Sequence, residues 1–303
     1  MTEFTLLQQK MADFSADCEL KFDEPMARHT SFRIGGNAEV MAFPKTIEAL
    51  AALLRFASKM GVKPVILGAG TNVLAPDTGM RGIVICLKDA LDGMELLDET
   101  RIRVMAGVTM TRAAVFAANH GLGGMEFAHG IPGTVGGGVF MNAGAYGGEI
   151  KDVAESVEIM DFSGNIRVLR NDEMEFSYRH SCLEESGEIM ISAIFHLEKA
   201  DAEAVKAKMK ELQAKRSASQ PLDLPSAGSA FKRPAQGYAA ALIDQSGLKG
   251  YQVGGAAIST KHAGFAVNLG GATAADVQTL LRQVSDIVYE KNGIRLEPEV
   301  RIW

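Results

Sequence analysis

The sequence predicts an α+β protein with mixed sheets, because helical and strand-like spacings of apolar residues alternate along the chain. The apolar residues of Ile47–Met60 recur at helical spacing, and this helix lies between strand patterns at Ala38–Phe43 and Val65–Leu67. That order is typical of a β-α-β unit. Farther along, Val157–Phe162 and Ile166–Leu169 flank a Ser-Gly-Asn turn, which indicates a hairpin.

The other elements of the N-terminal half follow from the same spacing argument. Thr46 is placed to cap the helix that begins at Ile47, and Gly61 to end it. The remaining patterns are a first helix with Leu6, Leu7, Met11 and Phe14 on one face, strands at Gly82–Leu87 and Ile102–Met105, and a helix at Met110–Asn119.

A change in composition marks the C-terminal part of the chain. Ile189–Leu197 is a strongly β segment, whereas Asp201–Lys215 is a charged helix, so we place the last domain boundary near residue 200. Farther on, Thr273 and Asp276 stand at the two positions of a capping box. The inner face of the helix that they open contains Val277, Leu280, Leu281, Val284 and Val288.

The composition is that of an ordinary soluble protein, with 303 residues of which 47% are hydrophobic and 22% charged. The formal net charge of −6 argues against a general nucleic-acid binder, since affinity for a phosphate backbone depends on clustered Lys and Arg. A local cationic pocket for a small anion is compatible with this charge.

Metal sites, disulfides and membrane segments are not indicated. Cys18, Cys86 and Cys182 form no CxxC pair, and the six histidines show no ligand spacing, so we expect no metal. The first ten residues lack the pattern of a signal peptide, and no apolar run approaches the length of a membrane span. We therefore expect a cytoplasmic protein that does not enter a membrane.

Two glycine-rich stretches carry most of the functional information. Val65–Leu74 has the letters VILGAGTNVL, and Gly130–Gly138 has the letters GIPGTVGGG. Such turns expose backbone N–H groups to phosphate oxygens, so the pair suggests two walls of a dinucleotide site. Val73 replaces the third glycine of a Rossmann fingerprint, and neither stretch ends as a P-loop does. Taken singly, each glycine is more often a simple tight turn.

Six further motifs accompany the two stretches in a fixed order. They are His29–Gly36 (HTSFRIGG), Met141–Glu149 (MNAGAYGGE), Tyr178–Ser181 (YRHS), Gly228–Pro234 (GSAFKRP), Lys261–Phe265 (KHAGF) and Leu296–Val300 (LEPEV). Together the eight motifs resemble the UDP-N-acetylenolpyruvoylglucosamine reductase family over nearly the whole chain. No long insertion separates Ser181 from the strand at Ile194, so the chain is similar to the family's shorter type, which lacks an extra substrate-capping loop.

The resemblance implies both a fold and a reaction. It implies a two-part FAD-binding region of the vanillyl-alcohol-oxidase type at residues 1–86 and 87–200, and a C-terminal α/β substrate domain at residues 201–303. NADPH would reduce non-covalently bound FAD, which would then reduce the enolpyruvyl group of UDP-N-acetylglucosamine enolpyruvate to give UDP-N-acetylmuramate for peptidoglycan. The protein must stabilise the negative charge that develops beside the substrate carboxylate and supply one proton.

Three residues match the family's catalytic positions. Arg179 would stabilise the enolate, because a guanidinium fork suits a carboxylate that gains charge. Ser229 would donate the proton, and Glu299 would assist it. Without the motifs, these residues would be interpreted as an ion-paired arginine, a turn serine and a solvated carboxylate. Glu297 would share a strand face with Glu299, and the sequence Glu-Val-Arg favours Glu299.

The remaining expected contacts come from the same motifs. Those to FAD are Leu67, Gly68, Ala69, Gly70, Thr71, Asn72, Ile131, Pro132, Gly133, Thr134, Val135, Gly136, Gly138, Asn142, Ala143 and Gly144, and those to substrate are Tyr146, Tyr178, Arg233, Lys261 and Arg301. The family has a basic residue where this chain has Ala241. One of Arg233, Lys261 and Arg301 would then supply the positive charge that the substrate diphosphate needs.

Two other functions stay open on the sequence. One is a flavin oxidase of alcohols or hydroxy acids on the same scaffold, and the other is a nucleotide-binding module without catalysis. The motifs that contain Ser229 and Glu299 favour the reductase. His29, His129 and the cysteines are candidates for a covalent flavin link, although we expect non-covalent FAD.

Overall fold

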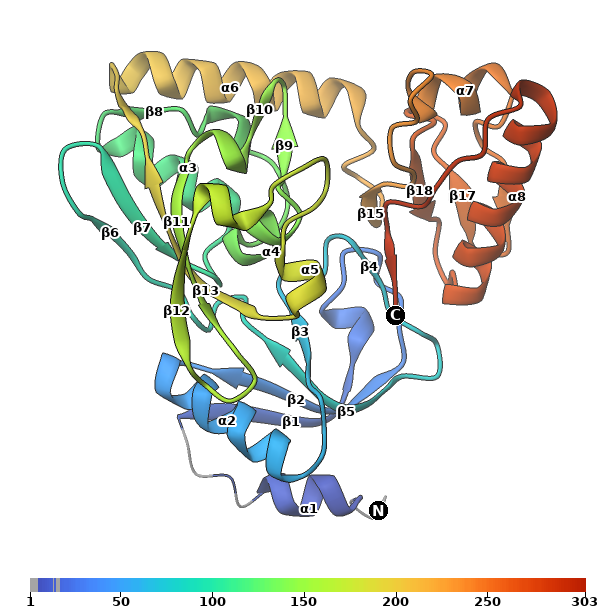
Figure 1. Cartoon of the computed structure of the whole chain (residues 1–303). Coiled ribbons are helices and arrows are strands. Elements are labelled where there is room, and N and C mark those ends of the chain that lie inside the picture. Colours follow the sequence, from blue (N-terminus) through green and yellow to red (C-terminus); the bar gives the residue numbers. More distant parts are fainter. Residues whose placement is uncertain (1–4, 13, 15–16) are drawn as a thin grey trace. The chain divides into compact units, whose positions relative to one another are not determined.

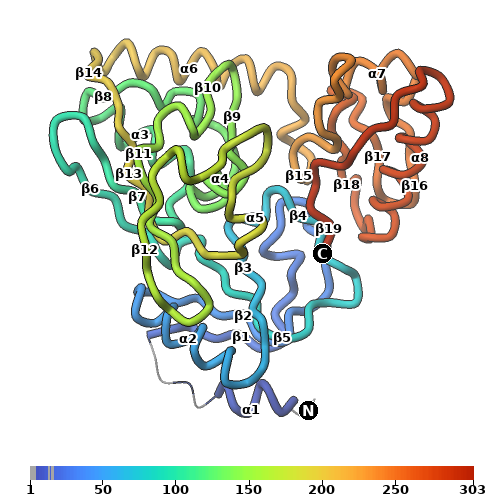
Figure 2. Tube along the Cα trace, in the orientation of Figure 1, coloured from blue at the N-terminus to red at the C-terminus, as the bar shows by residue number. Residues whose placement is uncertain are grey.

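A computed structural model describes residues 5–12, 14 and 17–303, and Figures 1 and 2 show its ribbon and its trace. The chain divides into two compact units, each assembled from separate stretches of sequence. Unit 1 contains the N-terminal residues up to Phe22, Glu39–Ala69 and Gly82–Lys215. Unit 2 contains Asp23–Ala38, Gly70–Arg81 and Arg216–Trp303.

The first sheet has the strand order β1-β2-β5-β3, which are Cys18–Pro25, Asn37–Pro44, Met80–Cys86 and Val65–Leu67. Helix α2 (Ile47–Lys59) connects β2 to β3, as the sequence predicts. Thr46 caps this helix, because its hydroxyl accepts a hydrogen bond from the Ala49 amide at 3.0 Å. Strands β3 and β5 are parallel.

The second sheet lies entirely in unit 1 and is antiparallel. Its order is β12-β11-β13-β7-β6, which are Ile166–Arg170, Ala154–Met160, Ile189–His196, Arg101–Met105 and Met94–Leu96. The predicted hairpin is therefore confirmed as β11 and β12. Helices α1 (Leu6–Ala12), α3 (Met110–Asn119) and α6 (Ala202–Ser219) confirm the three other helices that the sequence predicts before residue 220.

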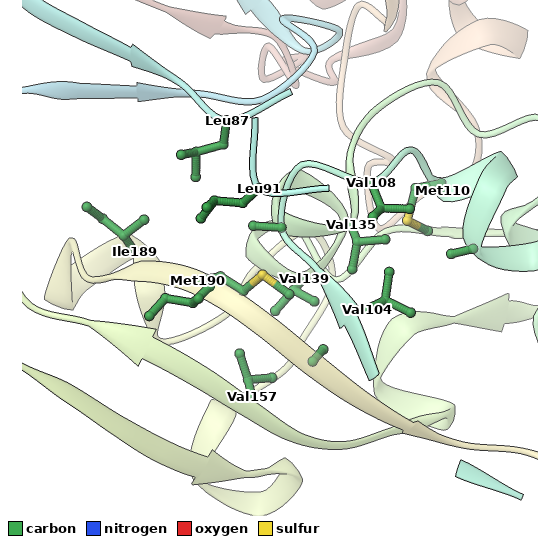
Figure 3. Close-up of a cluster of buried hydrophobic side chains, with 14 of the residues drawn as sticks. Leu87, Leu91, Val104, Val108, Met110, Val135, Val139, Val157, Ile189 and Met190 are labelled. Atoms are coloured by element: carbon green, nitrogen blue, oxygen red, sulfur yellow. The ribbon is translucent and has the colours of Figure 1, made fainter. Parts of the chain in front are cut away.

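The core of unit 1 holds helix α4 (Val135–Phe140) in place. Figure 3 shows Val135 and Val139 among the side chains of β7, β11 and β13, including Val104, Val157 and Met190. Both valines of α4 are fully buried. Because α4 begins within the second glycine-rich stretch, this packing fixes the position of that stretch.

Unit 2 is a sheet covered by two helices. The sheet order is β15-β18-β17-β16, which are Ser226–Ser229, Phe265–Asn268, Ala256–Ile258 and Gln252–Val253. Helix α8 (Ala274–Asn292) packs on β16 and β17 and against α7 (Ala239–Gln245) (Figure 1). All five predicted inner-face residues of α8 are buried, and Thr273 and Asp276 form the predicted capping box.

The remaining elements are short. They are α5 (Leu183–Ser186), the strand pairs β4 (Val73–Leu74) with β19 (Arg301–Ile302), β8 (Leu122–Gly123) with β14 (Glu198–Lys199) and β9 (Gly144–Ala145) with β10 (Gly148–Glu149), and the 3₁₀ turns η1 (Met26–Arg28), η2 (Glu126–Ala128), η3 (Ile150–Asp152) and η4 (Asn171–Met174). Parallel and antiparallel pairs coexist, so the mixed α+β class is confirmed. In the described part of the chain, no helix is both long and apolar enough to span a membrane.

Candidate active site

The two glycine-rich stretches border each other in unit 1. Gly68 follows strand β3, and Thr134 caps helix α4. A methyl group placed on Gly68 would lie only 2.5 Å from Thr134 Oγ1, which is closer than side-chain carbons approach other atoms. Position 68 therefore requires glycine unless Thr134 moves, and the two stretches are in contact as the walls of one site must be.

Backbone donors are present on both sides of this contact. Within the described residues, the amides of Ala69 and Thr134 donate to no protein acceptor. In α4, the Gly136 amide instead donates to Ala106 O at 3.0 Å, and the Gly137 amide to Thr134 Oγ1 at 3.3 Å. A close-packed glycine and two amides without protein acceptors fit a group rich in acceptor oxygens, such as the pyrophosphate of FAD.

Gly136 and Gly137 differ in their surroundings. A methyl group on Gly136 would lie 3.2 Å from both the Cβ and the carbonyl oxygen of Ala106, so Gly136 packs tightly against the chain that follows β7. The corresponding group on Gly137 would meet only Thr134 Oγ1, at an ordinary 3.6 Å. Of the two glycines, only Gly137 has space beside it that a larger side chain could occupy.

The end of the first glycine turn belongs to unit 2. Gly70 has a φ of +61°, and its carbonyl accepts a hydrogen bond from the Ser31 amide at 3.1 Å. Asn72 Nδ2 donates to the Glu299 carbonyl at 3.2 Å. The turn, the HTSFRIGG motif and the C-terminal LEPEV motif are therefore joined by hydrogen bonds in one unit, although they are far apart in sequence.

Arg179 stands at the tip of a tight turn in unit 1. Ser177 and His180 exchange both backbone hydrogen bonds, at 3.2 and 3.3 Å, so Tyr178 and Arg179 are the two central residues. The Arg179 guanidinium lies over the Tyr178 ring, 5.1 Å from its centroid. Arg179 has a φ of +57°, which is unfavourable for a residue with a side chain and is often found at functional sites.

The fully buried side chain of Asn142 links this turn to the end of α4. Its Nδ2 donates to Ser177 O at 3.0 Å and to Glu149 Oε2 at 2.8 Å, while its Oδ1 accepts from Lys151 N at 3.0 Å. The sequence predicts that Asn142 supplies a backbone donor to FAD, but its amide donates to Val139 O at 3.1 Å, and its side chain has no exposed surface and is bonded to protein groups. No sequence spacing connects Asn142 to Ser177, so this link was not predicted.

The two tyrosines expected at the substrate are exposed on unit 1. Tyr146 is 46% exposed at the tip of the β9–β10 hairpin, where it has a φ of +55° and Gly147 a φ of +91°. Positive φ at both central residues is the pattern of a type I′ turn. Tyr178 is 51% exposed beside Arg179. Both rings are therefore accessible to a ligand.

Ser229 and Glu299 are brought together within unit 2. Ser229 ends strand β15, next to Gly228 with a φ of +76° and an irregularity in the pairing with β18. The amide of Glu299 donates to the carbonyl of Ala230, the neighbour of Ser229, at 2.9 Å. Both Ser229 and Glu299 are half-buried. The predicted proton donor and its predicted partner thus lie on adjacent, hydrogen-bonded segments.

The two candidate glutamates flank an isolated antiparallel bridge between Pro298 and Phe231 rather than lying in a regular strand. The Lys232 amide donates to Glu297 O and the Glu299 amide to Ala230 O, both at 2.9 Å, and the expectation that the two side chains share a face stays a prediction. Glu297 is exposed, and its Oε2 lies 3.6 Å from Lys232 Nζ. Glu299 is half-buried beside Asn72 and Ala230. The surroundings therefore distinguish the two carboxylates and favour Glu299.

The basic residues expected at the substrate also lie in unit 2. The guanidinium of Arg233 stacks on the ring of Tyr238, 4.1 Å from its centroid, and both residues are exposed. Lys261 Nζ donates to Ser217 O at 2.7 Å. The Arg301 amide donates to the Asn72 carbonyl at 3.0 Å, which connects this arginine to the first glycine turn.

The three thiols lie in surroundings that favour the neutral form, because burial raises the pKa of each. Burial raises the pKa of Cys86 to about 11, and its Sγ lies 3.7 Å from the carbonyl oxygen of Gly68. Burial also raises the pKa of Cys18 to about 11, and it lowers the pKa of His129. Within the residues that the structure describes, no group of three or more His, Cys, Asp or Glu side chains is arranged to hold a metal ion.

Comparison with known proteins accounts for both parts of the chain. A model of an FAD-binding domain matches residues 38–170, and the model of the UDP-N-acetylenolpyruvoylglucosamine reductase C-terminal domain matches residues 220–303. The reductase of Caldanaerobacter subterraneus is 46% identical over 297 residues, covering 98% of each chain. That of Latilactobacillus sakei is 45% identical and covers 93% of each chain. The chain belongs to the UDP-N-acetylenolpyruvoylglucosamine reductase family.

Solved structures agree with this family assignment. The UDP-N-acetylenolpyruvylglucosamine reductase of Thermus caldophilus has a TM-score of 0.79 at 35% identity, covering 94% of this chain and 98% of that one. Alkyldihydroxyacetonephosphate synthase shares the fold at 18% identity, with a TM-score of 0.50 over 65% of this chain and 41% of its own. The predicted fold class, with an FAD-binding region and a reductase-family C-terminal domain, is confirmed, and the protein is an FAD-containing oxidoreductase.

Proposed function

We propose that this protein uses NADPH to reduce the enolpyruvyl group of UDP-N-acetylglucosamine enolpyruvate, giving UDP-N-acetylmuramate for peptidoglycan in the cytoplasm. The names of its relatives support the substrate class. The observation that most supports the chemistry is the hydrogen bond from the Glu299 amide to the Ala230 carbonyl, because it puts Glu299 on the segment beside Ser229.

FAD, when bound, supplies the hydride that NADPH has delivered to it. We propose that residues 1–86 and 87–200 hold this cofactor non-covalently and that residues 201–303 bind the substrate. The neighbouring Gly68 and Thr134 would border the pyrophosphate, with the amides of Ala69 and Thr134 as donors. The other predicted contacts in residues 67–72, 131–138 and 143–144 belong to the same proposal, whereas Asn142 is assigned no contact with FAD because its amide and its side chain are bonded to protein groups.

Arg179 would stabilise the charge that grows on the substrate as the hydride arrives. A guanidinium can donate two parallel hydrogen bonds to a carboxylate, which fixes both the distance and the orientation of the pair. Its place at the tip of a rigid turn supports this role, since a preorganised donor needs no rearrangement in the transition state.

Ser229 would donate the proton that completes the product. A serine hydroxyl is a weak acid, so it needs a strongly basic acceptor such as an enolate carbon and a neighbour that polarises it. Glu299, on the adjacent segment, would assist this transfer. Tyr146, Tyr178, Arg233, Lys261 and Arg301 would bind the substrate, and the exposed Arg233 is the first candidate for its diphosphate.

The test compares both half-reactions in Ser229→Ala under anaerobic conditions. Reduction of flavin by NADPH should keep its rate, because no proton from Ser229 is needed there. Reoxidation by the enolpyruvyl substrate should slow by about 10²–10⁴-fold, as expected for loss of a general acid. Stopped-flow absorbance of the flavin measures both steps.

Ser226→Ala is the matched control, because Ser226 begins the same strand β15. It should reoxidise at the wild-type rate. If Ser229→Ala also does so, Ser229 is only a turn residue and the proposed mechanism is wrong. A wild-type enzyme whose flavin is reduced by an alcohol or hydroxy acid and reoxidised by oxygen, but not by the enolpyruvyl substrate, would instead be the oxidase.

A further inference from the structure

We infer that Asn142 is a positioning residue whose buried amide fixes the Arg179 turn to the end of α4. It would thereby set the direction from which Arg179 meets the substrate carboxylate. The inference rests on the proposed role of Arg179, and all of the contacts that support it lie within unit 1.

Two fully buried side chains anchor the turn, one on each side of Arg179. Asn142 Nδ2 donates to Ser177 O at 3.0 Å, before the tip. Ser181 Oγ donates to Phe140 O at 2.8 Å, after the tip. Asn142 and Ser181 both have no exposed surface. Since Phe140 ends α4 and Asn142 follows it, both anchors attach the turn to one point of the fold.

The backbone at both ends of this link is held in an unfavourable conformation. Asn142 has a φ of +41° and Arg179 a φ of +57°. Such conformations persist only where the surrounding contacts impose them. A buried amide with all of its groups bonded can do so, because leaving its partners without hydrogen bonds would cost more than the strain.

The groups around the amide predict how a change of charge would act. Glu149 from β10 accepts from Asn142 Nδ2, and its other oxygen lies 2.7 Å from Lys151 Nζ. Asp152 accepts from the Glu149 amide at 2.9 Å. On the turn side stand Arg179 and His180, whose Nδ1 lies 3.5 Å from Glu184. Glu149 is the nearest carboxylate, so a second carboxylate at position 142 would be repelled.

Asn142→Asp tests the link through a pH profile. The new carboxylate can still accept a hydrogen bond from the Lys151 amide. It has no N–H to donate to Glu149 Oε2 and Ser177 O, so both of these acceptors lose their hydrogen bond from position 142. Two carboxylates that share a site raise the pKa of one of them, and the protonated form regains an O–H donor. The defect should therefore be large at pH 8 and smaller at pH 6.

The expected result concerns the second half-reaction. At pH 8, reoxidation of Asn142→Asp by the enolpyruvyl substrate should slow by about 10–100-fold, as expected when a catalytic group is displaced by about 1 Å. Flavin content and reduction by NADPH should stay near wild type. Lowering the pH to 6 should restore most of the lost rate relative to wild type at the same pH.

Two further variants separate positioning from stability. Asn142→Gly keeps the left-handed backbone but cannot be protonated, so it should slow reoxidation equally at both pH values. Asn171→Asp is the matched control, because Asn171 Nδ2 also donates to two carbonyls, those of Lys151 and Ala154, at 2.8 and 2.7 Å. It should destabilise unit 1 without slowing reoxidation.

Hydrogen exchange of residues 175–183 gives a readout that needs no substrate. The His180 amide, which donates to Ser177 O, should exchange faster in Asn142→Asp and Asn142→Gly than in Asn171→Asp. Unchanged exchange, or equal slowing of both half-reactions, would overturn the inference. If the wild type fails to reduce the enolpyruvyl substrate, the proposed function is wrong, and the exchange of this turn alone decides whether Asn142 anchors it.

Discussion

At the scale of single residues, backbone strain recurs in the part of the candidate site that lies in unit 1. Within the described residues, seven that are not glycine have positive φ, and Asn142, Tyr146 and Arg179 are three of them. Positive φ is costly for such residues. The sequence motifs selected these three by resemblance, but no residue pattern foretold that their backbones would be held in the left-handed region.

The glycines of the second stretch give a prediction at this scale. Gly137→Val should produce a folded protein with little flavin, because only Thr134 Oγ1 lies near the position of its Cβ. Gly136→Val should instead destabilise the protein by about 1–3 kcal/mol, since its side chain would press on Ala106. Flavin absorbance per protein and thermal unfolding followed by circular dichroism measure the two effects. Full flavin occupancy in Gly137→Val would show that this side of α4 does not face the cofactor.

At the scale of elements, the sequence predicted helices and strands well where one face is buried. Thr46, Thr273 and Asp276 were recognised as caps from local spacing alone, and the structure confirms their hydrogen bonds. The segment before β19 forms only an isolated antiparallel bridge, between Pro298 and Phe231, and the alternation of Glu297 and Glu299 does not reveal this partner. What decides its conformation is pairing with Ala230 and Asn72, which are distant in sequence.

Asp77 is a cap that no local pattern could reveal. Its carboxylate accepts from the amides of Ala274 and Ala275, at 2.8 and 3.2 Å, in the first turn of α8. It therefore joins the capping box of Thr273 from a segment far away in the chain. A carboxylate at a helix N-terminus satisfies unpaired amides and interacts favourably with the helix dipole.

Removing each cap should measure this contribution. Asp77→Ala and Thr273→Ala should each lower the free energy of unfolding by about 0.5–2 kcal/mol, because each leaves first-turn amides without an acceptor. Urea unfolding followed by far-UV circular dichroism gives both values. Asp223→Ala serves as the control, because Asp223 is an exposed turn residue of the same unit and has no positive φ. An Asp77→Ala protein as stable as the control would mean that water replaces the carboxylate without loss.

At the scale of the whole molecule, chain order and spatial order differ. The sequence predicts consecutive domains. We keep the boundaries at residues 86 and 200 as a proposal for which residues bind FAD and which bind the substrate. Yet unit 2 gathers Asp23–Ala38 and Gly70–Arg81 with the C-terminal residues. A single sequence shows periodicity within a segment but not which distant segments share a core. For this reason the sequence reveals the motifs themselves but not which of them lie in the same compact unit.

The composition of the unit 2 core leads to the last prediction. Phe32, Ile34 and Leu74 are at most 2% exposed and pack with the residues of α7 and α8. Burying such side chains stabilises a fold by about 1.5–3 kcal/mol each, which together is comparable to the whole stability of many domains. A fragment of residues 201–303 also lacks Asp77 and the parallel partner of β19. It should therefore be largely unfolded on its own.

Expression of that fragment tests the argument directly. Its amide proton spectrum should be poorly dispersed, and its unfolding by urea should lack a cooperative transition. A second polypeptide in which residues 23–38 and 70–81 are joined to the fragment by flexible linkers should recover part of both signals, since it restores the missing core residues and the cap. If the fragment alone unfolds cooperatively at the stability of the joined polypeptide, then the C-terminal residues are an autonomous domain, and the two N-terminal segments only cover a core that is already formed.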